Sequence, residues 1–554
     1  MNRIAFAFSI ILGVYIDWNI FRNHYSPLLI YWWLAVIFFL IVSIWKEIKF
    51  KSILRRFTKK KILLILLLIL PIIVRVANYN PDRMHPDEII TAYFSAKDDL
   101  FFSNFFAGIP RDKTQWVSQF PTPFFALQKI FFSVFGESFL TVRLSILPYV
   151  FITILMLYLT VRKIFDEKTA YISVIFYSFL SISLFLETLG LMFVSSTAIF
   201  MIFLYFAFCY LRNFSSCFAV LIGITAGFCY LFYITSYIAL PILVLIFIIA
   251  FIKKRKLHVL QNFIISILSM FIVLSPFLIN ALKFENYFVS RINQVSLLTG
   301  SWSGSPERIQ KGEKPINIIK ENLITSYRSL YFKDIGGHGG YNFGHLAFFE
   351  KYSFYLFTSG FVLSLFFLFT KIEIFFIYIL LLLSFLTMAL STPPPAFHRL
   401  TLAFPFIAIV SSVPFFLMMK LRIPSYVKYT LVILLLSIYI YNNQKYFIRS
   451  IKDDQNFEDF KIAEYILKNY PKRNIYVASF PGFGFEKLYY FYSGGKVKNR
   501  ISTAYHDYYL ANFNPNEKYV YVIIFPNDFN SKFAALDNQG RIIEFGSVFS
   551  LFVN

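Results

Sequence analysis

The chain alternates between long apolar blocks and short polar segments. Each block is about 17–23 residues long, which is the length that an α-helix needs to cross a hydrocarbon core about 30 Å thick. About thirteen blocks meet this criterion. They cover residues 4–20, 26–45, 61–79, 140–160, 169–187, 191–211, 216–234, 237–252, 259–281, 353–370, 372–391, 400–419 and 425–441. The pattern predicts an all-α polytopic membrane protein.

The polar segments between alternate spans are rich in lysine and arginine. The segment between the second and third spans carries Lys46, Lys49, Lys51, Arg55, Arg56, Lys59, Lys60 and Lys61. Positive charge in short loops marks the cytoplasmic side, and the later basic clusters at 162–168, 253–256 and 420–428 fall on this same side. We therefore predict a multi-pass protein of the plasma (inner) membrane with a cytoplasmic N-terminus and an extracytoplasmic C-terminus.

The same count places three long segments outside the membrane. Residues 80–139 contain apolar stretches too short to span, which are typical of helices lying in the membrane interface. From Asp453 onward, helical and strand-like patterns alternate, which predicts a small α/β domain. We expect three parts, which are 1–60 (two helices and a basic loop), 61–441 (a membrane domain with outer loops 80–139 and 282–352) and 442–554 (the outer α/β domain).

Composition and charge narrow the class of protein. The chain is 58% hydrophobic and only 15% charged, against about 25% charged residues in a typical soluble domain. The net charge of +23 would suggest a nucleic-acid partner in a soluble protein, but here most of the basic residues set membrane orientation. The three cysteines lie in or beside apolar blocks, so they predict no disulfide framework and no metal site.

A cluster of polar residues directly after the third span is the strongest chemical signal. It reads His85-Pro86-Asp87-Glu88. Pro86 suits the first turn of a helix and the two acids suit its positive end, so one interpretation is that they only begin a helix. The alternative is a general base held at the level of the lipid head groups.

This carboxylate pair, in a first outer loop with interfacial helices, resembles the GT-C membrane glycosyltransferases. The closest resemblance is to the protein O-mannosyltransferases and the lipid A aminoarabinose transferases. Four more segments resemble family motifs in the family's order, at 120–150, 186–197, 223–244 and 393–410. The chain departs from the pattern in three places: it has an extra N-terminal span, Glu187 where an aspartate is usual, and His398-Arg399 where an arginine-tyrosine pair is commoner.

The resemblance implies an inverting transfer of a sugar from a polyprenyl-phosphate carrier (undecaprenyl or dolichyl) to an acceptor hydroxyl at the outer membrane face. The expected partners are the lipid-linked donor, a glycan, lipid or protein acceptor, and membrane lipids. Neither a cofactor nor a metal is implied, because arginines can neutralise the phosphate. The implied site residues are Asp87 and Glu88 (catalytic), Arg143, His398 and Arg399 (donor phosphate), and His85 and Glu187 (substrate-binding).

Structural alternatives stay open for several of these residues. Arg143 could be an interfacial arginine that extends toward water, the His398-Arg399 pair could anchor a loop, and Glu187 could be solvated. Arg75, near the outer end of the third span, is a candidate ion-pair partner for one of the acids.

Two other functional classes compete with the glycosyltransferase hypothesis. A lipid or sugar transporter would carry charges near the bilayer midplane, whereas the blocks here are nearly charge-free at their centres. A lipid-linked glycan polymerase or ligase would use basic residues in a late outer loop, as 282–352 could supply. The polar residues at the outer boundary favour chemistry at the membrane surface.

Overall fold

The computed structural model divides into two compact units. The first comprises Met1–Tyr79, Asp98–Ala126 and Ile146–Asp454, and the second Asn80–Lys97, Leu127–Ser145 and Gln455–Asn554. The described residues are 1–45, 61–79, 85–96, 105–106, 116–284, 290–301, 303–332, 335, 341, 343–391, 395–452, 458–478, 485–493, 501–504, 518–524, 541–545 and 549–553.

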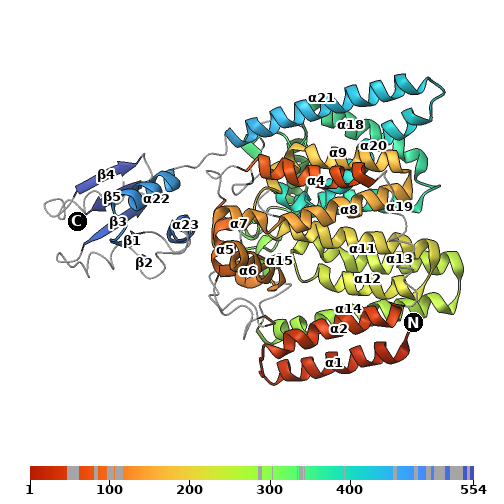
Figure 1. Ribbon diagram of the computed structural model, residues 1–554, viewed down its shortest axis with the longest axis horizontal. Coiled ribbons are helices and arrows are strands. Elements are labelled where there is room, and N and C mark those ends of the chain that lie inside the picture. Colours follow the sequence, from red (N-terminus) through yellow and green to blue (C-terminus); the bar gives the residue numbers. More distant parts are fainter. Residues whose placement is uncertain are drawn as a thin grey trace. The chain divides into compact units, whose positions relative to one another are not determined.

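The first unit is helical, and every predicted span overlaps at least one helix (Figure 1). Its helices are α1 (Arg3–Phe21), α2 (Leu28–Ile44), α4 (Lys61–Ala77), α8 (Leu147–Ile164), α9 (Glu167–Phe179), α10 (Ser181–Leu186), α11 (Phe193–Asn213), α12 (Ser216–Cys229), α13 (Ala239–Lys254), α14 (Leu257–Phe284), α15 (Ser290–Val295), α16 (Ser305–Gln310), α17 (Pro315–Ser329), α18 (Lys351–Ser364), α19 (Ile372–Ala389), α20 (Ala403–Lys420) and α21 (Ser425–Lys452). The short 3₁₀ helices η4 (Ile234–Ile238) and η7 (Phe397–Leu400) precede α13 and α20.

Eight helices within the described ranges are long and apolar enough to cross a membrane, so the protein is an integral membrane protein. Four more apolar helices are shorter, among them α2 and α12. The number of crossings and the orientation of the termini remain predictions. The span predicted at 169–187 is divided into α9 and α10, because the chain leaves helical geometry at Leu180 (ψ 116°).

Close helix packing holds the first unit together. Helix α12 lies against α14 at Gly223 and Gly227, where a Cβ atom would meet the α14 backbone. The N-terminal pair α1 and α2 lies beside α14 in Figure 1, and the Trp33 indole donates a hydrogen bond to the Val273 carbonyl at 2.9 Å. Small residues that let helix backbones approach are the usual basis of helix association in membranes.

The second unit combines two parts of the first outer loop with the C-terminal segment. The loop contributes α5 (Pro86–Ala96), the end of α6 (Pro123–Phe135) and α7 (Phe139–Leu144). The C-terminal segment contributes α22 (Glu458–Asn469), α23 (Phe485–Tyr492) and the strands β1 (Asn474–Ala478), β2 (Ile501–Ala504), β3 (Tyr519–Ile524), β4 (Arg541–Phe545) and β5 (Phe549–Val553).

The strands form one sheet in the order β2-β1-β3-β5-β4. Strand β1 pairs in parallel with β2 and β3, whereas β5 is antiparallel to β3 and β4. This grouping differs from the expected division in two respects. The boundary expected at 442 lies inside α21, and segments of the first outer loop pack with the C-terminal segment because they share its hydrophobic core.

Candidate active site

The polar cluster after the third span forms the beginning of α5, as the sequence predicts. His85 precedes the helix, and its Nδ1 accepts a hydrogen bond from the Asp87 backbone N–H at 3.0 Å. Glu88 is the third helical residue, and its Oε2 lies 3.5 Å from the His85 backbone nitrogen. This arrangement is similar to a capping box, except that the side chain before the helix bonds the second helical N–H and not the third. The acids therefore do stabilise the start of the helix.

Glu88 also forms a buried ion pair with Arg143 of α7. The Arg143 Nε donates to Glu88 Oε1 at 3.0 Å, and an Nη of the same guanidinium lies 3.4 Å from Oε2. The Glu88 side chain is fully buried and that of Arg143 is 6% exposed. Two parallel contacts of this kind fix the orientation of both groups. Arg143 is thus directed at Glu88, an arrangement that the sequence analysis did not predict.

Asp87 has different surroundings from its neighbour. Its side chain is 34% exposed, and Oδ2 lies 3.9 Å from His85 Nδ1. Successive helical residues point about 100° apart, so the burial of Glu88 leaves Asp87 on another face of α5. Of the two predicted catalytic carboxylates, Asp87 is the one that an incoming hydroxyl group can reach.

A short polar network supports the same helices and was not recognised in the sequence. The Ser95 hydroxyl on α5 donates to Gln128 Oε1 on α6 at 2.6 Å, and Gln128 Nε2 donates to the Ser145 hydroxyl at 3.3 Å. All three side chains are buried. Serine and glutamine in apolar segments give no distinctive sequence pattern, so only the fold shows that they connect.

In the first unit, Arg75 pairs with Glu187, which confirms that Arg75 is a partner of one of the acids. Glu187 is fully buried and also accepts hydrogen bonds from the hydroxyl groups of Ser183 (2.7 Å) and Tyr177. Arg75 in turn donates to Ser183 at 2.9 Å and to the Pro71 carbonyl at 3.1 Å. The alternative that Glu187 is solvated is therefore wrong. A role in substrate binding stays a prediction.

His398 and Arg399 lie in η7 and are also buried, at 9% and 4% exposure. Aromatic rings surround His398: its ring centroid lies 4.2 Å from that of Tyr341 and 6.0 Å from that of Phe193. Burial lowers the pKa of the Arg399 guanidinium, and the neighbouring charge of Arg291 lowers it further, although Tyr233 and Tyr341 favour the charged form. Burial is the largest of these effects, so the net shift of this pKa is downward.

The first unit also contains an apolar cavity of about 470 Å³, which Leu400 of η7 helps to line. Its lining comes from α17, α18, α19, η7 and α20, and it includes Phe348, Phe349, Phe361, Leu400 and Ala403. Leu400 directly follows Arg399 in η7. An almost wholly apolar lining suits a hydrocarbon chain and not a sugar.

Within the residues that the structure describes, no group of three or more His, Cys, Asp or Glu side chains could hold an ion. The three cysteines are buried and separate.

Comparisons with known proteins agree with the resemblance seen in the sequence. Residues 120–280 match the sequence profile of the family described as dolichyl-phosphate-mannose-protein mannosyltransferase. No curated protein sequence matches the chain.

Solved structures show the fold. The crystal structure of ArnT from Cupriavidus metallidurans in the apo state superposes with a TM-score of 0.56 at 11% identity, covering 89% of this chain and 98% of ArnT. The structure of the same ArnT bound to undecaprenyl phosphate gives 0.50 at 12% identity, with the same coverage. The archaeal oligosaccharyltransferase AglB from Archaeoglobus fulgidus, in complex with an inhibitory peptide and a dolichol-phosphate, gives 0.51 at 14% identity, covering 85% of this chain and 70% of AglB. The chain therefore has the fold of the GT-C membrane glycosyltransferases, as the sequence resemblance predicts.

Proposed function

We propose that this protein is an inverting glycosyltransferase that moves a sugar from a polyprenyl-phosphate carrier to an acceptor hydroxyl at the outer membrane face. The observation that carries the proposal lies in the first unit, where the buried Arg399 directly precedes Leu400, a residue that lines an apolar cavity. A polyprenyl phosphate has the same two parts, an anionic head and a long hydrocarbon tail. The structural neighbours bound to undecaprenyl phosphate and to dolichol-phosphate support this choice of ligand.

The head group would bind at η7. Burial and the charge of Arg291 both lower the pKa of the Arg399 guanidinium. The negative charge of a nearby phosphate would favour the charged form of this guanidinium and so act against both effects. Charge-assisted hydrogen bonds to phosphate are stronger than neutral ones. His398 is the second proposed donor. The tail would enter the cavity that Leu400 helps to line, where each buried methylene contributes about 0.8 kcal/mol.

The reaction needs a base for the acceptor hydroxyl, and Asp87 is the proposed base. The acceptor oxygen attacks the anomeric carbon, the bond from that carbon to the phosphate oxygen breaks, and its electron pair stays on the phosphate. The hydroxyl proton passes to the Asp87 carboxylate. Glu88, held by Arg143, orients this end of α5, and His85 caps it while lying beside Asp87.

Carrier binding tests the head-group and tail assignments. We expect Arg399→Gln to weaken binding of polyprenyl phosphate by about ten- to a hundredfold, because a hydrogen bond to a charged group contributes about 1.5–3 kcal/mol. Arg308→Gln is a matched control, since Arg308 pairs with Glu313 and Glu321 on the surface of the same unit. The affinity would be measured in lipid nanodiscs by native mass spectrometry.

A variant that fills the cavity tests binding of the lipid tail separately from binding of the phosphate head group. Ala403→Phe should weaken binding of the long-chain carrier while leaving a short-chain phosphate unaffected. If wild type, Arg399→Gln and Ala403→Phe bind the long-chain carrier with equal affinity, the proposed binding site is wrong. Carrier binding without release of polyprenyl phosphate from any lipid-linked sugar would instead favour a glycan ligase or a transporter.

A further inference from the structure

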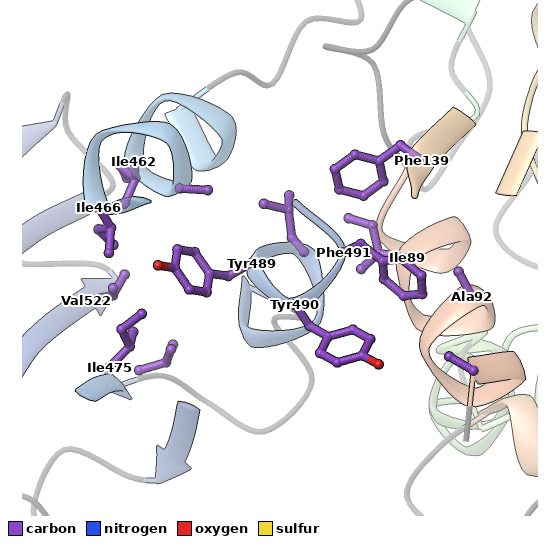
Figure 2. Packing of buried hydrophobic residues seen from close by; sticks show 14 of the residues in the cluster. Ile89, Ala92, Phe139, Ile462, Ile466, Ile475, Tyr489, Tyr490, Phe491 and Val522 are labelled. Carbon is purple, nitrogen blue, oxygen red and sulfur yellow. The ribbon is translucent and has the colours of Figure 1, made fainter. Parts of the chain in front are cut away.

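The C-terminal segment contacts the helix that carries both proposed catalytic carboxylates. Helix α5 has two faces in the second unit. Its polar face, with Glu88 and Ser95, is bonded to Arg143 and Gln128. Its apolar face, with Ile89, Ala92 and Tyr93, packs in a hydrophobic cluster with α23 (Figure 2).

Helix α23 joins this cluster to the core of the sheet. Figure 2 shows Tyr489 directed toward Ile466 and Val522, whereas Tyr490 and Phe491 lie toward Ile89 and Phe139. One short helix thus packs on the sheet with one side and on the outer-loop helices with the other.

The individual contacts reach all three outer-loop helices. The ring of Tyr490 meets that of Tyr93 on α5 at 5.7 Å, and the ring of Phe491 lies 5.7 Å from Phe132 on α6 and 6.1 Å from Phe139 on α7. The Tyr490 hydroxyl donates to Glu137, in the turn that begins α7. The contacts therefore fall on both helices that form the Glu88–Arg143 pair.

We propose that α23 is a positioning element for the carboxylates, with Tyr490 and Phe491 as its positioning residues. This inference rests on the proposed function. By holding α5 and α7 against a common surface, α23 keeps Glu88 paired with Arg143 and fixes the direction of Asp87. The C-terminal segment then acts on the chemical step itself, in addition to any recognition of the acceptor.

Turnover of full-length variants tests this role. Phe491→Ala should lower kcat by on the order of a hundredfold, the effect of displacing a catalytic group by about 1 Å, with KM for the lipid-linked donor unchanged. Phe491→Leu should restore most of the rate. Tyr490→Phe, which keeps the ring but removes the hydroxyl that donates to Glu137, should have a smaller effect of the same kind. Val522→Ala, in the sheet on the far side of the same cluster, is the control for general loosening of the unit.

Hydrogen exchange separates this inference from the proposed activity. The backbone amides of 89–96 should exchange faster in Phe491→Ala than in wild type or Val522→Ala, whether or not any donor is turned over. Unchanged exchange in α5, or equal losses of kcat in Phe491→Ala and Val522→Ala, would overturn the positioning role. If wild type releases no carrier but hydrogen exchange in α5 still depends on Phe491, the result supports the packing of α23 on α5 and contradicts the proposed function.

Discussion

Asp87 and Glu88 are adjacent in the sequence but differ in burial and partners. Glu88 is enclosed and held by Arg143, whereas a third of the Asp87 side chain is exposed. The sequence predicts the pair, because two acids after a span and a proline are conspicuous. It could not assign their partners. Arg143 was expected at the phosphate, and its pairing with Glu88 depends on how α5 meets α7.

The same limit applies to the residues around η7. His398 and Arg399 stand out as polar residues at the beginning of a span, so the sequence identifies them. Tyr233, Tyr341 and Arg291 come from distant segments, and aromatic residues are too abundant in this chain to signal a site. Which rings gather at His398 follows only from tertiary packing.

The Arg75–Glu187 pair gives a prediction about stability. Glu187→Gln should destabilise the protein by about 3–5 kcal/mol, because it leaves a buried arginine without its counter-charge. The double variant Arg75→Met, Glu187→Met should recover most of this loss, since it removes both charges. Thermal unfolding in nanodiscs would measure both. Unchanged stability of Glu187→Gln together with lost donor binding would instead indicate a substrate-binding role.

At the scale of elements, the apolar blocks predict the helices because length and hydropathy are local properties. Breaks within a predicted helix and extensions beyond its apolar part are harder to predict. The turn at Leu180 lies inside a continuous apolar block, and α21 continues past its apolar part to Lys452. The break leaves the hydropathy pattern unchanged, because a bend needs only a few altered dihedral angles. The hydropathy pattern ends with the apolar part of α21 and does not show that the helix continues.

The contact between α12 and α14 gives a prediction at this scale. A Cβ at Gly223 would lie 2.1 Å from the Ser266 carbonyl oxygen. We therefore expect Gly223→Ala to separate the two helices at a cost of about 1–3 kcal/mol, as overpacking does. Gly13→Ala on α1, another helix beside α14, is the matched control, since its Cβ would approach only the Cγ2 methyl group of Ile272 at 3.3 Å. Equal unfolding temperatures of the two variants would contradict the close approach.

At the scale of the whole molecule, the sequence predicts the order of the parts but not their grouping. A long outer loop followed by ten more predicted spans gives no local sign that its helices share a core with the C-terminal segment. Such a contact between distant segments depends on whether the shapes of their apolar faces are complementary. The grouping matters for the proposed mechanism, because it brings the C-terminal segment to the helix that carries Asp87.

Membrane orientation is a further prediction at this scale. With a cytoplasmic N-terminus, Lys253→Cys should be protected from a membrane-impermeant maleimide in intact cells, and Lys468→Cys should react. Both positions are exposed, and the native cysteines are buried. Permeabilised cells are the control, in which both variants should react. The reverse labelling pattern would contradict the orientation that the basic clusters predict.

Release of polyprenyl phosphate from a panel of lipid-linked sugars, compared between wild type and Asp87→Asn in nanodiscs, tests the central claim most directly. Wild type should release the carrier with at least one donor. Asp87→Asn should be slower by about 10²–10⁴, the usual contribution of a general base, while still binding the carrier. Glu321→Gln, an exposed acid on α17, should retain the wild-type rate. Undiminished release by Asp87→Asn would contradict the account and assign the proton transfer to another group.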